Sequence, residues 1–164
     1  MSDKPASPIR PTDDDARALA RMLIDGAGHG ALGVIDPATG GPMVTRIAVA
    51  RDMDGGPMTL ISSLSAHTAA LQINPACSLL LGDPGPRGDP LTHPRITLQC
   101  RAGFVPRPGA EHDALRARYL DQQPKAKLYI DFGDFTLVRL RITEAHLNGG
   151  FGQAYRLTPG DLDL

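Results

Sequence analysis

The sequence predicts a mainly β (α+β) fold, a small antiparallel barrel with helices at its margins. Short apolar runs resembling strands are joined by turns rich in Gly and Pro, which is typical of hairpins. A few segments with helical spacing flank these runs, as in α+β folds. The chain has 164 residues and no evident internal repeat. We therefore expect one domain over residues 12–164, preceded by a flexible, proline-containing arm over residues 1–11.

Composition narrows the classes of function. Lys plus Arg number 17 and Asp plus Glu 18, a net charge of −1, so no global field attracts nucleic acid or an anionic membrane. Any anion site must be local. The chain has no apolar run near the ~20 residues that span a bilayer, and its N-terminus has no apolar signal core, so we expect a cytoplasmic protein. Cys77 and Cys100 lie in separate apolar runs, which predicts buried free thiols rather than a metal or redox pair.

The first half of the chain predicts a helix, three strands and a second helix. Thr12, as N-cap before three aspartates, starts the first helix, and Gly26 and Gly28 end it. Strands are expected at 30–36, 43–52 and 57–63, joined by short turns as an antiparallel meander. Residues 65–75 then predict a short helix that Ser65 caps and Pro75 ends.

The second half adds strands and two further helices. Strands at 77–83 and 95–105 flank a loop over 83–94 that is rich in Pro and Gly. This loop either covers a site or is disordered. Helices are expected at 109–122 and 124–132, and the last strands at 136–142 and 146–157. The Gly149–Gly152 run either lines a pocket or makes a turn.

The candidate chemistry lies where the third strand meets the second helix. Ser62 and Ser63 end the strand, and the sequence Ser65-Ala66-His67-Thr68 begins the helix. The free backbone N–H groups at a helix start suit a phosphate. The serine and threonine hydroxyls, the imidazole of His67 and the guanidinium of Arg46 can add further hydrogen-bond donors. From residue types alone, simple helix caps and solvated arginines are favoured over a phosphate site by roughly two to one.

The chain also resembles a known superfamily. The segment over 59–81 is similar to the strand, phosphate turn, helix and strand of the pyridoxamine 5′-phosphate oxidase-like, flavin-mononucleotide (FMN)-binding split barrels. It most resembles the haem-utilisation (HugZ-type) branch. The matching positions are Ser62, Leu64, His67, Thr68 and Leu71, with a late run of Gly149, Gly150, Phe151, Gly152 and Ala154. The similarity covers most of residues 13–157.

The resemblance implies a split β-barrel of antiparallel strands that binds FMN at the interface of a homodimer. The implied phosphate contacts are Arg46, Ser63, His67 and Thr68, with Arg51 at a second basic position. The implied ring and ribityl contacts are Ile47, Val49, Ile61 and Ser62, and Gln99 reaches in from the other subunit. The resemblance implies no metal ligand set, and we assign no catalytic residue.

Several departures from the family pattern affect the site. Ala66 stands where the vitamin B6 oxidases place an arginine, and His67 stands where they place a lysine. Arg46 and Arg51 are five residues apart, so a regular strand points them to opposite faces, and Arg46 is the better candidate. The chain also ends before the extension that carries a haem-binding histidine in some members.

Three functions remain open from the sequence. The first is an FMN-dependent oxidoreductase with a small-molecule substrate. The second is a haem-binding or haem-degrading protein. The third is a non-enzymatic flavin carrier or sensor.

Overall fold

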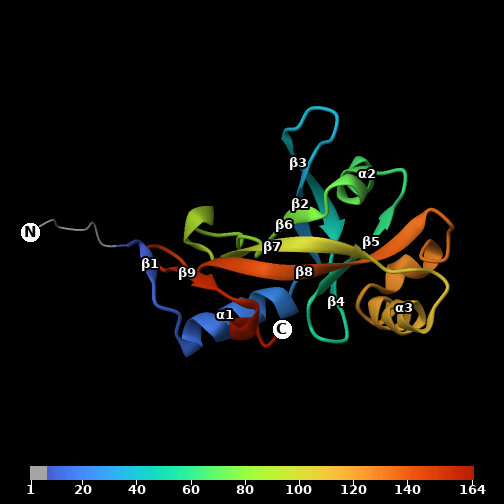
Figure 1. Ribbon diagram of the computed structural model, residues 1–164. Helices are drawn as coiled ribbons and strands as arrows, with labels where there is room; N and C mark the ends of the chain where they lie inside the picture. The colour runs from blue at the N-terminus through green and yellow to red at the C-terminus, as the bar shows by residue number, and fades with distance from the viewer. Residues whose placement is uncertain (1–6) are drawn as a thin grey trace, which may run out of the picture.

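The computed structural model describes residues 7–164, which form a strand-rich fold with three α-helices (Figure 1). The helices are α1 (Asp14–Asp25), α2 (Ala66–Ile73) and α3 (Ala110–Gln122), with 3₁₀ turns η1 (Pro90–Thr92), η2 (Pro124–Leu128) and η3 (Pro159–Leu162). The strands are β1 (Ile9–Arg10), β2 (His29–Ile35), β3 (Pro42–Ala48), β4 (Ala50–Arg51), β5 (Pro57–Ser62), β6 (Ala76–Leu81), β7 (Arg95–Phe104), β8 (Phe135–Asn148) and β9 (Ala154–Leu157).

The strands pair in the order β1-β9-β8-β7-β6-β2-β3, and every pair except β1–β9 is antiparallel. The long strand β8 also pairs with β5, which in turn pairs with β4. No ladder joins β3 to β5 among the described residues, so the barrel is split there. The predicted split-barrel fold is confirmed. The predicted third strand forms a hairpin with the end of the predicted second, because β5 pairs with β4. The other edge of β5 pairs with the distant β8 and not with β3.

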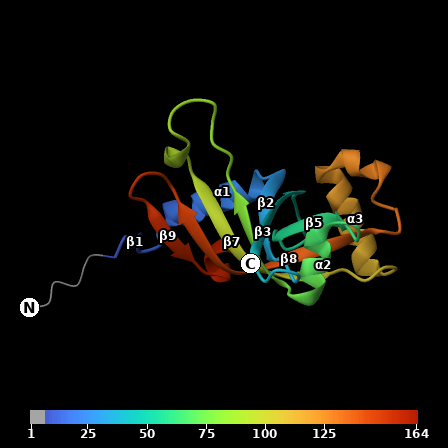
Figure 2. The same cartoon turned by 90° about the horizontal axis from the view of Figure 1, so that it is seen from above.

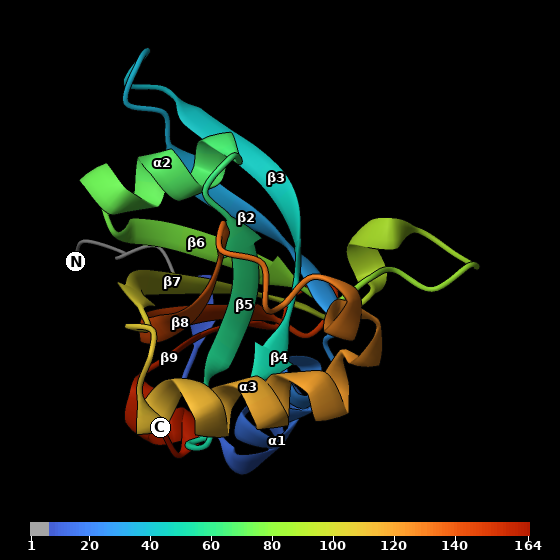
Figure 3. The ribbon, with the colours of Figure 1, turned by 90° about the vertical axis from the view of Figure 1, so that its right-hand side faces the viewer.

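Two hydrophobic cores lie on opposite sides of β8. The first fills the barrel with aliphatic side chains from β2, β6, β7 and β8 and is closed by α1 and α2. The second lies between β5, β8 and α3 and includes Leu60, Leu115, Tyr119 and Leu137. Figure 3 shows α2 and α3 at opposite ends of β5. Strand alternation explains the division, because neighbouring residues of β8 point to opposite faces.

Several element boundaries differ from the sequence expectations. Helix α1 is capped by Asp13, whose carboxylate accepts from the Ala16 N–H at 2.8 Å, rather than by Thr12. The hydroxyl of Thr12 instead donates to the Arg156 carbonyl. Of the predicted flexible arm, Ile9 and Arg10 pair with β9, and residues 1–6 lie outside the described part. The predicted strand over 43–52 is interrupted at Val49 into β3 and β4.

The two glycine-rich regions left open by the sequence have defined structures. Gly149–Gly152 belong to the turn between β8 and β9, where Gly150 and Gly152 have positive φ angles of 128° and 69°. The 83–94 loop projects from the sheet (Figure 2) and is tied together by His93, whose Nδ1 accepts from the Gly85 N–H at 3.2 Å. Both cysteines are buried and free, as predicted. Burial raises the pKa of Cys77 to about 11.

Candidate functional site

The start of α2 is the first place where the structure gathers predicted site residues. Ser65 is the N-cap, but its hydroxyl makes no capping bond, contrary to the predicted cap. Thr68 is buried and donates to the Ser62 carbonyl at 2.6 Å, and Ser62 donates to Asp134 at 2.6 Å. The hydroxyls of Ser62 and Thr68 are therefore committed within the protein, whereas Ser63 is exposed and Ser65 is half-buried.

His67 has the most unusual environment of these residues. Its Nδ1 lies 3.0 Å from the Thr45 hydroxyl, and its Nε2 is buried without a partner among the described residues. Burial lowers the pKa of His67 below its usual value of 6.5, so the ring is neutral at pH 7. In the tautomer whose Nδ1 accepts from Thr45, the proton is on Nε2, and this nitrogen is then a buried donor without a partner among the described residues.

The two arginines are separated from this cluster. Thr45 meets His67, so by strand alternation Arg46 starts on the opposite face of β3, where it is exposed. Arg51 lies beyond the break at Val49, and its Nε is 3.7 Å from the Asp25 carboxylate. The structure therefore brings neither arginine to His67.

The predicted ring contacts lie in the first core. Ile47, Val49 and Ile61 are 5%, 2% and 3% exposed, so their side chains offer almost no surface to a ligand. They remain predicted contacts through their backbone atoms alone. Apolar strand residues were expected to line the flavin ring, but the alternation of β3 and β5 turns Ile47 and Ile61 into the barrel.

The side of the sheet that faces away from the first core carries a surface that we call the open face. It consists of the outward residues of five neighbouring strands: Val44 and Arg46 of β3, Ala31 and Gly33 of β2, Ser78 and Leu80 of β6, Thr97, Gln99 and Arg101 of β7, and Arg141 of β8. The predicted partner-subunit contact, Gln99, is exposed on this face.

The middle of the open face is a floor of small side chains. Ala31 pairs with Arg46 on one side and Leu80 on the other, and Gly33 pairs with Val44 and Ser78. A Cβ built on Gly33 would come no closer than 3.8 Å to another atom. Val44 and Leu80 are 68% and 43% exposed beside this floor. The surface is therefore flat, partly apolar and open to a planar ligand.

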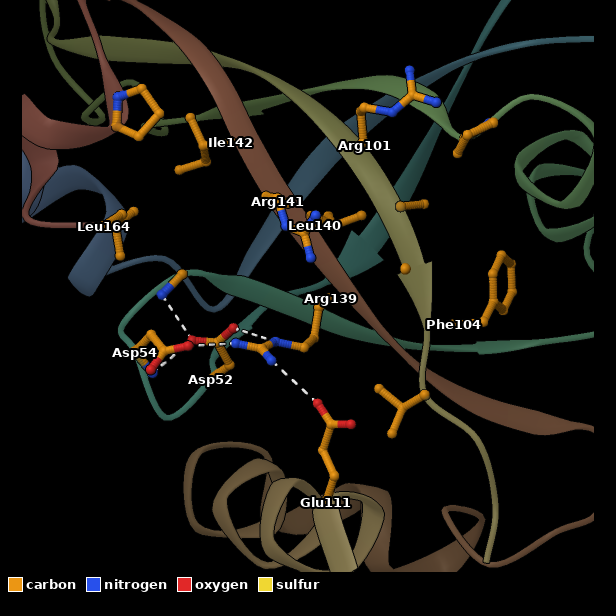
Figure 4. Close-up of a pocket in the computed structure, with 16 residues that line it drawn as sticks. Asp52, Asp54, Arg101, Phe104, Glu111, Arg139, Leu140, Arg141, Ile142 and Leu164 are labelled. Atoms are coloured by element: carbon orange, nitrogen blue, oxygen red, sulfur yellow. Dashed lines mark hydrogen bonds and ion pairs between the residues drawn. The ribbon is translucent and has the colours of Figure 1, made fainter. Parts of the chain in front are cut away.

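A third feature was missed entirely by sequence reasoning. Arg139 of β8 forms ion pairs with Asp52 at 2.8 Å, Asp54 at 2.6 Å and Glu111 at 3.2 Å (Figure 4). Asp52 is only 4% exposed and also accepts from the backbone N–H groups of Asp54 and Gly56. These residues come from β8, the β4–β5 turn and α3, and no local pattern joins them. Thr45 and Asp134 were missed for the same reason.

Two classes of feature are absent from the part of the chain that the structure describes. Over residues 7–164, no three His, Cys, Asp or Glu side chains gather as metal ligands. No helix in that range has the length and apolar character needed to cross a membrane.

Comparison with known proteins identifies the relatives of this chain. The family model described as CREG, beta-barrel matches residues 11–162. The Arabidopsis thaliana protein named non-canonical heme oxygenase HOZ, chloroplastic, is 36% identical over 139 residues, which are 82% of this chain and 40% of that protein. This chain thus spans less than half of that relative.

Two solved structures extend the comparison. The heme binding protein from Mycobacterium smegmatis is 28% identical, with a TM-score of 0.82, and the match covers 94% of this chain and 61% of that one. A Clostridium acetobutylicum protein of the pyridoxinephosphate oxidase family is 12% identical, with a TM-score of 0.67 over 92% of this chain and 99% of that one. The second likeness shows the fold alone. Together with the family match, these structures confirm the superfamily that the sequence resembled.

Proposed function

We propose that this chain, which belongs to the CREG β-barrel family, binds haem on its open face. The observation that carries the proposal is the flat floor of Ala31, Gly33 and Ser78 beside exposed Val44 and Leu80. A porphyrin is a rigid, largely apolar plane, and small side chains let such a plane approach the backbone closely. The relative named a heme oxygenase and the one named a heme binding protein support the same ligand.

Charged groups at the margin of the floor suit the rest of the haem molecule. Arg46 is exposed, pairs in register with Ala31, and has no ion-pair partner within residues 7–164. A guanidinium in this position suits a propionate carboxylate. His29 and His146 share the open face, with Nε2 atoms 2.9 Å from Asp83 and 2.8 Å from Glu144. These two imidazoles are the candidate iron ligands on this side of the sheet.

Haem, when bound, supplies the iron redox chemistry, and the residues of this chain hold the ring and exclude water. A single flat face leaves the other side of a ring in solvent. We therefore propose that a second copy packs its open face over the first and forms a homodimer, as the family resemblance implies. Exposed Val44, Leu80 and Gln99 are the central contacts of that interface.

The dimer has a direct test. Light scattering of purified protein should give the mass of two chains. Leu80→Arg places a charge at the centre of the interface and should shift the mass to one chain without unfolding the protein, since Leu80 is outside both cores. A wild-type mass of one chain at micromolar concentration would contradict the interface.

The haem proposal is tested by titration followed at the Soret band. Gly33→Val should weaken binding at least tenfold, because its side chain would stand up from the floor while the backbone has room for a Cβ. Ala114→Val, on the exposed side of α3, is the matched control and should bind as wild type. His29→Gln and His146→Gln ask which imidazole reaches the iron, by a change in the position of the band. Equal haem affinity in Gly33→Val and wild type would refute the open-face site.

FMN is a second candidate, favoured by His67 alone. The residues predicted to bind the phosphate do not all meet, because Arg46 lies on the other face of β3 and the hydroxyl of Thr68 already donates to the Ser62 carbonyl. The start of α2 nevertheless keeps the buried, unpartnered Nε2 of His67 and the uncommitted hydroxyls of Ser63 and Ser65, which fit a phosphate. Flavin would supply hydride or electron transfer there, and reduction by a nicotinamide cofactor would distinguish an oxidoreductase from a carrier.

Flavin fluorescence separates the two candidates. If FMN binds at α2, the protein quenches its fluorescence and His67→Gln weakens binding, whereas Gly33→Val does not. No quenching at micromolar protein removes the flavin proposal and leaves the haem proposal intact.

A further inference from the structure

A cavity of about 800 Å³ adjoins the open face, because Arg101 and Arg141 of that face line it. Its walls are the C-terminal half of β7, the middle of β8, the β4–β5 turn, the start of α3 and the last residues of the chain (Figure 4). None of the residues predicted from sequence to bind a cofactor lines it. Phe104, Pro75 and Leu164 give it apolar surface.

On one side of the cavity the charged side chains are already paired with one another. The three carboxylates that line it, Asp52, Asp54 and Glu111, all point to the guanidinium of Arg139. In Figure 4 the dashed lines from all three acids meet at this one side chain. Charge-assisted hydrogen bonds of this kind hold carboxylates in place. These acids are therefore committed to Arg139.

The other side carries two arginines without acidic partners. Arg101 of β7 and Arg141 of β8 are directly opposite each other in the strand register, and both are exposed. Neither side chain makes a hydrogen bond or an ion pair with any residue between 7 and 164. Like charges placed directly across a sheet destabilise it. Two residue pairs further along, Gly103 lies opposite Arg139 and leaves open space between the charged groups.

We infer that Arg101 and Arg141 together bind a tetrahedral oxyanion, the phosphate of a small organic phosphate ester, inside this cavity. A phosphate dianion presents enough acceptor oxygens for two planar guanidinium groups at once, and its charge removes their mutual repulsion. The apolar surface of Phe104, Pro75 and Leu164 takes the organic part. This site lies on the open face beside the proposed haem floor and uses none of the floor residues Ala31, Gly33 and Ser78.

The test is a titration at constant ionic strength with two probes, inorganic phosphate and phenyl phosphate. Both should bind, and phenyl phosphate more tightly because it also covers apolar surface. Arg101→Gln and Arg141→Gln should each weaken binding at least tenfold, since each removes charge-assisted hydrogen bonds. Arg156→Gln, an exposed arginine on β9 outside the cavity, is the matched control and should leave both affinities unchanged.

Two further measurements keep the outcome decisive. Phosphate should raise the melting temperature of wild type but not that of the Arg101→Gln, Arg141→Gln double variant. Gly33→Val should retain phenyl phosphate binding even where it has lost haem, which separates this site from the proposed function. Inorganic phosphate that binds equally in wild type and the double variant would mark an adventitious site and overturn the inference. So would a double variant that becomes monomeric, because a second copy would then be the partner of these arginines.

Discussion

The two faces of the central strands differ sharply in what they carry. On β7, Ile96, Leu98 and Cys100 point into the barrel and are at most 3% exposed, whereas Gln99 and Arg101 between and beyond them point outward. The inward set is large and apolar, and the outward set is small, polar or charged. Stability and binding are therefore encoded by alternate residues of the same strands, so the two properties can be changed separately.

The largest effect on stability is expected from a substitution on the inner face of β7. Leu98 is fully buried, so Leu98→Ala should lower the free energy of unfolding by about 2–5 kcal/mol through lost burial and a cavity. The neighbouring Gln99→Ala should change it by no more than about 0.5 kcal/mol. Chemical denaturation of both variants makes the measurement. Similar losses in the two would show that the open face is also a packed surface within one chain.

A smaller effect is expected where a charge is buried beside the second core. Asp52 accepts from two backbone N–H groups and from Arg139, so Asp52→Asn should cost about 1–3 kcal/mol. Asp54 binds the same arginine, but its side chain is 74% exposed. Asp54→Asn should therefore lower the free energy of unfolding by less than about 1 kcal/mol. Thermal denaturation ranks the two variants. Equal costs would mean that the arginine cluster contributes little more than surface charge.

The smallest expected effect is a pH dependence of stability that comes from His67, the histidine of α2 that contacts Thr45 on the inner side of β3. Burial lowers the pKa of His67 in the folded protein, so the unfolded chain binds its proton first as pH falls. The neutral ring contributes its full stabilisation above about pH 6.5, and this is lost as pH drops below that value. Between pH 7 and 5, wild type should therefore lose stability more steeply than His67→Gln. If the stability of the two proteins changed in parallel with pH, the ring of His67 would be exposed to water in the folded protein.

The sequence predicted most elements because their signals are local. The helices at 14–25, 66–73 and 110–122 follow from apolar spacing and capping residues, and strands β6 and β7 follow from apolar runs between Gly and Pro. The pairing of β5 with β8 could not be predicted, because it joins residues about 77 positions apart, such as Leu60 and Leu137, that share no local pattern.

The candidate site shows the same limit at the level of single residues. His67 was predicted from its position at a helix start, but its partner Thr45 depends on which face of β3 turns inward. Alternation gives the two faces but not which one faces the core. Arg46 and Ile47 were therefore both assigned to one site, although the structure separates them across the sheet.

Strand β8 has a consequence for how the molecule opens. It is hydrogen-bonded to β7 along one edge and to β5 and β9 along the other, and Leu137 and Val138 enter different cores. Neither core can come apart without disrupting the strand that supports the other. Backbone amides in the middle of β8 should exchange with deuterium only through global unfolding, so both halves of the barrel melt as one cooperative unit.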